Sequence, residues 1–280
     1  MNMMQKQALP NPICWHEGAL LAPQHFQQNQ FYWEAQFQRL RQHISPYAWG
    51  LAGLDYDAGE LLQGRILINT LSAAMPDGLM LDYDARFESP LVLDMSESDA
   101  LAVGATLLIN LVVPVQVPGS ASDSATIQRF DVSEEAPVVD ENTGDGDMVL
   151  TRLKPKWALQ AGRDISKKYI ALPLFEVCRP DGGSYALTPY CPPLLHIGAD
   201  DFRLQEEGKH KTLQQECKQL ALTLRKKARL LAGLSEQDEE RLGRQVSEQH
   251  RLWIRALVRE LTDFEILVDN PFTAPYALYL

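Results

Sequence analysis

The sequence has few cysteines and none of the short motifs that mark common enzyme classes. Its four cysteines, Cys14, Cys178, Cys191 and Cys217, form no CxxC pair and share no metal-type spacing with a histidine. Scattered cysteines in a chain of this size predict reduced thiols rather than a disulfide framework. The sequence also contains no GxSxG, P-loop or GxGxxG motif. We therefore expect no catalytic residue, no cofactor and no metal.

The sequence also lacks a long apolar run and an excess of basic residues. Residues 101–117 are the longest apolar candidate, but Gly104, Asn110 and Pro114 interrupt them. A membrane span needs roughly 20 apolar residues, so this stretch predicts a buried strand. Lysine and arginine number 26 against 37 acidic residues, and the net charge of -11 repels phosphate backbones and anionic lipid surfaces. We predict no nucleic-acid binding, no direct membrane insertion and, because residues 1–10 have no apolar core, no secretory signal.

The first two thirds of the 280 residues predict one helix followed by a sheet-rich domain. Residues 23–44 contain no glycine and have proline only at the first position, and apolar side chains recur at helical spacing until Pro46. Short apolar runs separated by turn signals then follow, which is typical of a sandwich or barrel-like sheet domain. We expect strands at residues 65–74, 79–83, 107–117, 148–159, 169–178 and 185–188. Turns are expected at 76–78 and 180–183, and 118–147 is expected to be a mobile acidic excursion in which 127–132 could add an edge strand.

The C-terminal part predicts a long αα-hairpin. Apolar residues recur every three or four positions after residue 212 and again after a capping-type sequence at 235–238, with Gly233 as the expected end of the first helix. Two helices alone leave apolar stripes in water, so we expect an oligomeric helical bundle. The expected seam consists of Leu213, Leu220, Leu224, Trp253, Leu257 and Leu261.

Three other groups of residues were weighed for chemistry or recognition. His16, Glu17 and His25 contain two histidines and a glutamate, but Gly18 and Pro23 break the helical spacing that a zinc site requires. Residues 140–147 resemble a calcium loop, yet Gly144 occupies a ligand position and the stretch reads as a solvated acidic loop. The aromatic-rich helix is open to two interpretations, core packing on the sheet domain or anchoring of a protein partner. Its rings, with one from the preceding segment, are Trp15, Phe26, Phe31, Tyr32, Trp33 and Phe37.

Residues 15–28 read WHEGALLAPQHFQQ. This stretch resembles the opening signature of the TssK family of type VI secretion baseplate proteins, which has the form W-x-E-G-x-x-L-x-P-Q-H-F-Q-Q. Residues 46–50, PYAWG, resemble the next family landmark, P-Y-x-W-G. Further landmarks follow in order at 64–65, 76–78, 129–140, 179–182 and 191–193. The resemblance covers at least residues 13–197, with compatible helices after it.

The resemblance implies a cytoplasmic, non-enzymatic adaptor that assembles as a homotrimer. It implies a shoulder domain at 1–198 that docks onto the TssF–TssG wedge, a helical neck at 199–270 and the start of a further element at 271–280. In the family, a C-terminal head then contacts TssL and TssM, so those partners are expected only where the head is present. The shoulder residues assigned to the partner interface are Trp15, Glu17, Pro23, His25, Phe26 and Gln27. A receptor-binding or tail-fibre protein of phage type is the main alternative, and a metal-dependent enzyme is the second.

Overall fold

The computed structural model describes residues 9–45, 47–95, 104–117, 127–180, 183–199, 205–206, 209–210, 212–241 and 244–279. At 205–206, 209–210, 232–241 and 244–250 it describes the backbone only. The chain divides into two compact units, Met1–Ala48 and Trp49–Leu280, which are treated separately. The boundaries expected at 198 and 270 remain a prediction. Pro46, Leu242, Leu280, 118–126 and half of the turn at 180–183 lie outside the described residues.

The first unit contains the helix α1 (Pro23–Ile44), as predicted from residues 23–44. Pro23 occupies the first helical turn, where a backbone N–H has no intrahelical partner to lose. The backbone N–H of Ala22 donates to Nδ1 of His25 at 3.2 Å, which satisfies a donor at this helix end. At the other end, the Ser45 N–H donates to the Arg41 carbonyl at 2.8 Å. The proline and the histidine of the opening signature therefore begin this helix.

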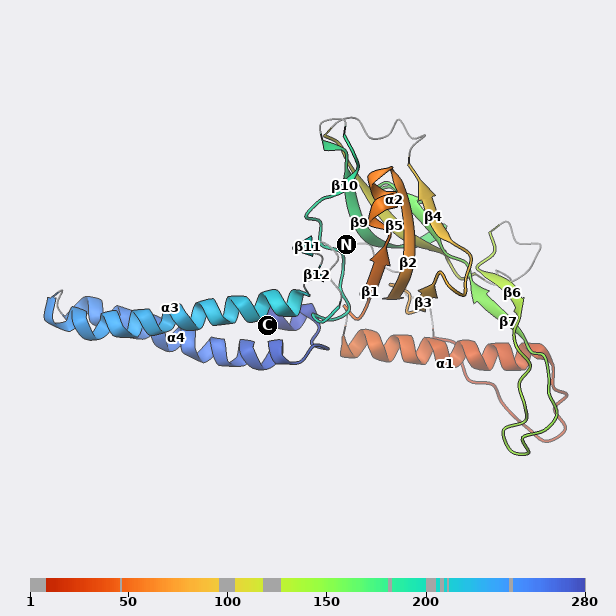
Figure 1. Cartoon of the computed structure of the whole chain (residues 1–280). Coiled ribbons are helices and arrows are strands. Elements are labelled where there is room, and N and C mark those ends of the chain that lie inside the picture. Colours follow the sequence, from red (N-terminus) through yellow and green to blue (C-terminus); the bar gives the residue numbers. More distant parts are fainter. Residues whose placement is uncertain are drawn as a thin grey trace. The chain divides into compact units, whose positions relative to one another are not determined.

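The second unit contains two four-stranded antiparallel sheets, visible in Figure 1. In the first sheet, β2 pairs along its length with β1, while β3 and β4 pair with its C-terminal and N-terminal halves. In the second, the order is β10-β9-β5-β8. The first sheet comprises β1 (Gly50–Tyr56), β2 (Arg65–Ala74), β3 (Met80–Asp84) and β4 (Leu91–Asp94), with the short helix α2 (Ala58–Leu62) between β1 and β2. The second comprises β5 (Thr106–Pro114), β8 (Ala158–Ala161), β9 (Tyr169–Cys178) and β10 (Ala186–Leu187).

One hydrophobic core contains side chains from both sheets. Ile66 and Ile68 of β2 belong to the same buried cluster as Leu111 of β5 and Leu172 of β9. The alternation of buried and less buried residues along β2 reflects the two-residue period of a strand with one buried face. In β5, by contrast, every residue from Ile109 to Pro114 is buried, because this strand lies inside its sheet between β8 and β9.

Two further ribbons lie outside these sheets. One is β6 (Phe130–Glu134) paired with β7 (Thr151–Pro155), and the other is β11 (Gln205–Glu206) paired with β12 (Lys209–His210). The strand suggested at 127–132 corresponds to β6. The prediction of one strand at 148–159 was wrong, because this stretch is divided between β7 and β8. Pro155 has no N–H to continue a ladder, and the chain crosses there from the ribbon to the second sheet.

The strands at 65–74 and 169–178 are confirmed with the same bounds, and those at 79–83, 107–117 and 185–188 are confirmed with shifted ends. The turn after β2 is held by hydrogen bonds from Gly78 N–H to the Met75 carbonyl and from Leu79 N–H to the Asp77 carboxylate. Four strands were missed. β1 contains two glycines, which are poor strand formers, β4 has only four residues, and β11 and β12 have two residues each.

Two long helices follow, α3 (Leu213–Arg241) and α4 (Arg244–Asp269), and then the short 3-10 helix η2 (Pro275–Tyr279). α3 and α4 pack antiparallel. The Gln214 side chain donates to the Val268 carbonyl at 2.7 Å, and Arg225 forms an ion pair with Glu265. The expected break at Gly233 was wrong, because α3 continues to Arg241. A single glycine costs a helix only about 1 kcal/mol, which tertiary packing readily offsets. The chain is therefore α+β, as predicted.

The base of this helix pair is tied to the segment that leaves the second sheet. The Ile197 N–H donates to the Thr273 carbonyl at 2.9 Å, and the Gly198 N–H donates to the Pro271 carbonyl at 2.8 Å. Ile197 is fully buried, and the Gln214 N–H donates to its carbonyl. The residues that follow α4 therefore pack against the chain that precedes α3.

Candidate protein-interaction surfaces

The opening signature forms a compact turn before α1. The Trp15 ring lies 5.6 Å from the His25 ring, and the Ala19 N–H donates to the His16 carbonyl at 3.2 Å. Gly18 has a φ of 80°, which supports the reversal between them. The structure thus brings Trp15 and His25 together. Four other assigned residues, Glu17, Pro23, Phe26 and Gln27, are exposed, and no contact joins them into one cluster.

α1 presents a continuous apolar stripe to solvent. No residue of this 22-residue helix is buried. Because each residue turns the helix by 100°, five of its apolar side chains lie within roughly 60° of one another. These are Phe26, Trp33, Phe37, Leu40 and Ile44, and all five are exposed. A stripe of this kind is typical of a surface that binds protein, because large aromatic side chains contribute most to interface energies.

The expected seam residues of the helix pair fall into three groups by exposure. Leu261 is buried between α3 and α4 with Cys217, Ala221 and Ala228, so its surface is covered within one chain. Leu220 and Trp253, by contrast, are 51% and 55% exposed. The other three, Leu213, Leu224 and Leu257, are half-buried.

The exposed seam residues lie on one side of the pair. Leu220 precedes the buried Ala221 by about 100° of rotation, and Trp253 precedes the buried Leu261 by about 80°. The two helices run antiparallel and face each other through Ala221 and Leu261. Side chains that precede these buried residues by a similar rotation therefore point to the same side of the pair. Leu222, displaced by about 100° in the other sense, lies on the opposite side and is also exposed. Among the side chains that the structure describes, Leu220 and Trp253 therefore give the pair an apolar side that remains about half exposed.

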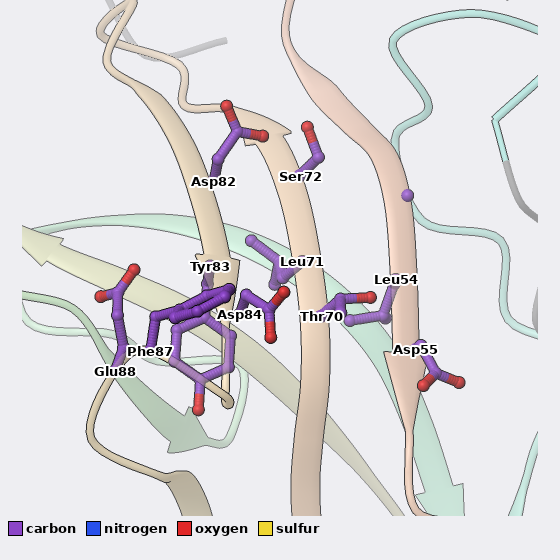
Figure 2. Close-up of a pocket in the computed structure, with 11 residues that line it drawn as sticks. Leu54, Asp55, Thr70, Leu71, Ser72, Asp82, Tyr83, Asp84, Phe87 and Glu88 are labelled. Atoms are coloured by element: carbon purple, nitrogen blue, oxygen red, sulfur yellow. The ribbon is translucent and has the colours of Figure 1, made fainter.

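A shallow acidic groove of about 500 Å³ crosses the outer face of the first sheet (Figure 2). Strand pairing aligns Asp55, Thr70 and Asp84 in one row and sets Asp82 beside Ser72 in the next. Asp55 accepts a hydrogen bond from the Asn69 amide at 3.0 Å. The sequence analysis missed this surface. The polar residues that alternate with buried ones in 80–84 were the available signal, but such alternation marks any solvated sheet face.

Two carboxyl groups of the groove, those of Asp84 and Glu88, have pKa values shifted in opposite directions. Hydrogen bonds from Arg86 lower the pKa of Asp84 to about 2. Burial raises the pKa of Glu88 above its usual value, although the Lys154 cation opposes this shift and the Asp84 charge adds to it. The residues that line the groove include no histidine, lysine or cysteine, so the groove has the chemistry of a polar binding surface rather than of a general acid–base pair.

The histidines considered for metal binding have other partners. His16 lies 3.0 Å from the Glu17 carbonyl, and His25 accepts from Ala22. Among the described residues, no group of three or more His, Cys, Asp or Glu side chains is arranged to hold a metal ion. The four cysteines are free thiols, and Cys217 is buried, which raises its pKa. In the same described part, none of the helices combines the length and apolar character needed to cross a membrane.

Comparison with known proteins assigns a family. A family model described as "Bacterial Type VI secretion, VC_A0110, EvfL, ImpJ, VasE" matches residues 25–280. The type VI secretion system baseplate component TssK1 of Pseudomonas aeruginosa is 28% identical over 200 residues, which cover 68% of this chain. The match spans 43% of the length of that relative, so the chain corresponds to less than half of it.

Solved structures share the fold. A crystal structure of TssK superposes with a TM-score of 0.76 at 22% identity and covers 96% of this chain and 59% of that one. A cryo-electron microscopy structure of the type VI secretion TssK–TssF–TssG baseplate subcomplex gives a TM-score of 0.75 at 20% identity. That match covers 96% of this chain and 84% of the other chain. These likenesses extend over both the sheets and the helix pair. The chain belongs to the TssK family of bacterial type VI secretion baseplate proteins.

Proposed function

We propose that this chain is a structural adaptor of the type VI secretion baseplate. In this proposal its β-sandwich shoulder binds the TssF–TssG wedge through the N-terminal segment and α1, and its helix pair joins three copies into a trimeric neck. The domain limits remain those of the sequence prediction, 1–198, 199–270 and 271–280. The observation that carries the proposal is α1, a 22-residue helix with no buried residue and an apolar stripe.

The wedge-binding part is supported by chemistry and by relatives. A relative of the same fold is described in complex with TssF and TssG. The assigned residues Trp15, Glu17, Pro23, His25, Phe26 and Gln27 surround the start of α1, where Phe26 is 59% exposed. Aromatic side chains on a rigid helix bind a partner at low entropic cost, because they have few rotatable bonds to immobilise.

The trimeric neck is supported by the uncovered side of the helix pair. Leu220 and Trp253 each leave about half of their surface in water, and full burial of such side chains is worth roughly 1.5–3 kcal/mol each. Repetition along two long helices makes self-association the simplest way to cover this side. The number three comes from the family resemblance, not from the spacing of the leucines.

The proposed adaptor is a cytoplasmic protein that catalyses no reaction. In the part of the chain that the structure describes, its surfaces bear apolar stripes and solvated carboxylates, which suit binding to protein. TssL and TssM enter the proposal only for a protein that carries the C-terminal head.

The wedge-binding test uses the tagged chain and purified TssF–TssG from the same source. We expect the chain to capture both proteins and Phe26→Asp to weaken capture at least tenfold. Gln28→Asp adds the same charge about 200° away on α1 and is expected to change capture less than twofold. Failure of the unmodified chain to capture TssF–TssG would overturn the proposal.

A further inference from the structure

The ribbon of β6 and β7 has one apolar and one charged face. Register pairs Val132 with Leu153, and the flanking pairs are Asp131 with Lys154 and Ser133 with Arg152. Because side chains alternate between the faces of a strand, Val132 and Leu153 share one face with the pairs Phe130–Pro155 and Glu134–Thr151. The pairs Asp131–Lys154 and Ser133–Arg152 share the other face, so the first face is apolar at its centre and base and ends in a carboxylate. Val132 and Leu153 are 59% and 52% exposed, although they lie side by side. The apolar face therefore stands in water.

The exposed apolar surface continues beyond the two strands. Val138 and Met148 form an isolated bridge in which each N–H donates to the other's carbonyl at 2.9 Å. Five apolar side chains in this extension are exposed: Val138, Val139, Met148, Val149 and Leu150. Several exposed apolar side chains gathered in one segment mark an interaction site more often than a single exposed leucine does.

Figure 1 shows the β6–β7 ribbon, and contacts at its base attach it to the rest of its unit. Arg129, immediately before β6, is 3% exposed, pairs with Asp77 at 2.7 Å and also donates to the Pro114 carbonyl. On the other strand, the Lys156 N–H donates to the Arg129 carbonyl at 2.8 Å. At the far end, the Asp140 carboxylate accepts from the Asn142 and Thr143 N–H groups and orders the turn. A two-stranded ribbon is marginally stable in water, so these contacts hold it in an orientation ready for a partner.

The charges around the apolar face determine the chemistry of that partner. The cations of the ribbon have carboxylates nearby. Arg152 forms an ion pair with Glu135. Burial raises the pKa of Glu88, and the charge of Lys154 opposes this rise. Within the part of the chain that the structure describes, five other carboxylates of the ribbon form no ion pair: Glu134, Asp140, Glu141, Asp145 and Asp147. The surface is thus apolar with an acidic rim. A second copy of the chain, with a net charge of -11, is a poor electrostatic match.

We propose that residues 130–155 are a second docking surface, which inserts its apolar face into an apolar, lysine- and arginine-rimmed surface of the TssF–TssG wedge. This inference rests on the proposed wedge-binding function and adds a contact separate from α1. The apolar face supplies the binding energy, and the acidic rim orients the ribbon and accelerates association.

The test compares carboxylates placed on the two faces of the ribbon. Affinity for immobilised TssF–TssG is measured with the full chain, with Val132→Asp/Leu153→Asp, and with the control Ser133→Asp, which lies on the charged face beside Arg152. We expect the double variant to bind at least tenfold more weakly and the control to bind within twofold. A further variant, Asp145→Lys/Asp147→Lys, reverses charge in the exposed turn without touching the ladder. It should also weaken binding, and more strongly at low salt.

The outcomes separate this inference from the proposed function. Capture by the unmodified chain with undiminished affinity in the double variant would overturn the ribbon contact and leave wedge binding intact. Equal loss in the double variant and in Ser133→Asp would also overturn it. A change in oligomer mass in the double variant would assign the ribbon to a second copy instead. No capture by the unmodified chain would overturn both proposals.

Discussion

The buried guanidinium of Arg129 donates to the Asp77 carboxylate at 2.7 Å, which joins the base of the β6–β7 ribbon to the turn between β2 and β3. The two residues are 52 positions apart in the sequence. Asp77 also accepts from the Leu79 N–H and so orders its own turn. Breaking an ion pair made by a 3% exposed arginine costs more free energy than breaking one on the surface. The reason is that the buried environment does not offer water in place of the lost partner.

Replacement of this arginine should therefore loosen the ribbon. For Arg129→Gln we expect a loss of about 3 kcal/mol in the free energy of unfolding, because the substitution removes both the buried ion pair with Asp77 and the hydrogen bond to the Pro114 carbonyl. Urea denaturation measures the loss, and hydrogen exchange should show faster exchange in 130–155. The control is Arg152→Gln, whose pair with Glu135 is about half-exposed and contributes less than about 1 kcal/mol. Equal effects of the two substitutions would contradict this account.

A second prediction concerns the close approach of β1 to the segment after β10. Gly50 has a φ of 140°, and a Cβ at this position would lie 2.6 Å from the Pro193 carbonyl oxygen. Gly50→Ala combines backbone strain with a clash against backbone atoms, so we expect a loss on the order of 3 kcal/mol. Gly144→Ala is the control, because Gly144 also has a positive φ but no heavy atom within 4 Å. It should lose about 1 kcal/mol by thermal or chemical unfolding.

A third prediction tests the proposed seam of the helix pair. Leu220→Asp places a carboxylate on the side that also bears Trp253, and we expect it to lower the oligomer mass while the sheets stay folded. Leu222→Asp introduces the same group on the opposite side of α3, where Leu222 is similarly exposed. We expect the oligomer mass of the Leu222→Asp variant, measured by light scattering, to equal that of the unmodified chain. Circular dichroism of both variants should retain the helical signal, and an unchanged mass for Leu220→Asp would argue against this seam.

The raised pKa of Glu88 predicts a pH dependence. An acid whose folded-state pKa exceeds its unfolded value favours folding while it is protonated, and that contribution is lost as pH rises through the folded-state pKa. Glu88→Gln removes the charge that burial disfavours. The variant should therefore equal the wild type in stability below pH 4 and match or exceed it at pH 7. Urea denaturation at both values checks this, and a variant less stable only at pH 7 would mean that the attraction of Lys154 outweighs burial.

The sequence predicted α1, β2 and β9 to the residue, because each combines clear periodicity with strong punctuation by proline or glycine. The prediction of helix and strand bounds was wrong where tertiary contacts override the local conformational preference. Helix α3 runs through Gly233, and β7 and β8 fall within one predicted strand but belong to different sheets. The exposed apolar face of the ribbon could not be foreseen either, since strand alternation does not say which face meets solvent.

Several of the family landmarks contact one another in the structure. The glycine of PYAWG meets Pro193 of the later landmark at 191–193, and the aspartate of the turn at 76–78 meets Arg129 of the landmark at 129–140. Spacing in the sequence could not reveal these pairs, because they lie 143 and 52 positions apart. Their roles lie in packing and ion pairing, which agrees with a protein that works by assembly.

The measurement that tests the central claim most directly is the mass of the full chain in solution by size-exclusion chromatography with multi-angle light scattering. The account predicts a particle of about three times the 31.5 kDa of one chain. A monomer at micromolar concentration, with Leu220 and Trp253 left in water, would contradict it.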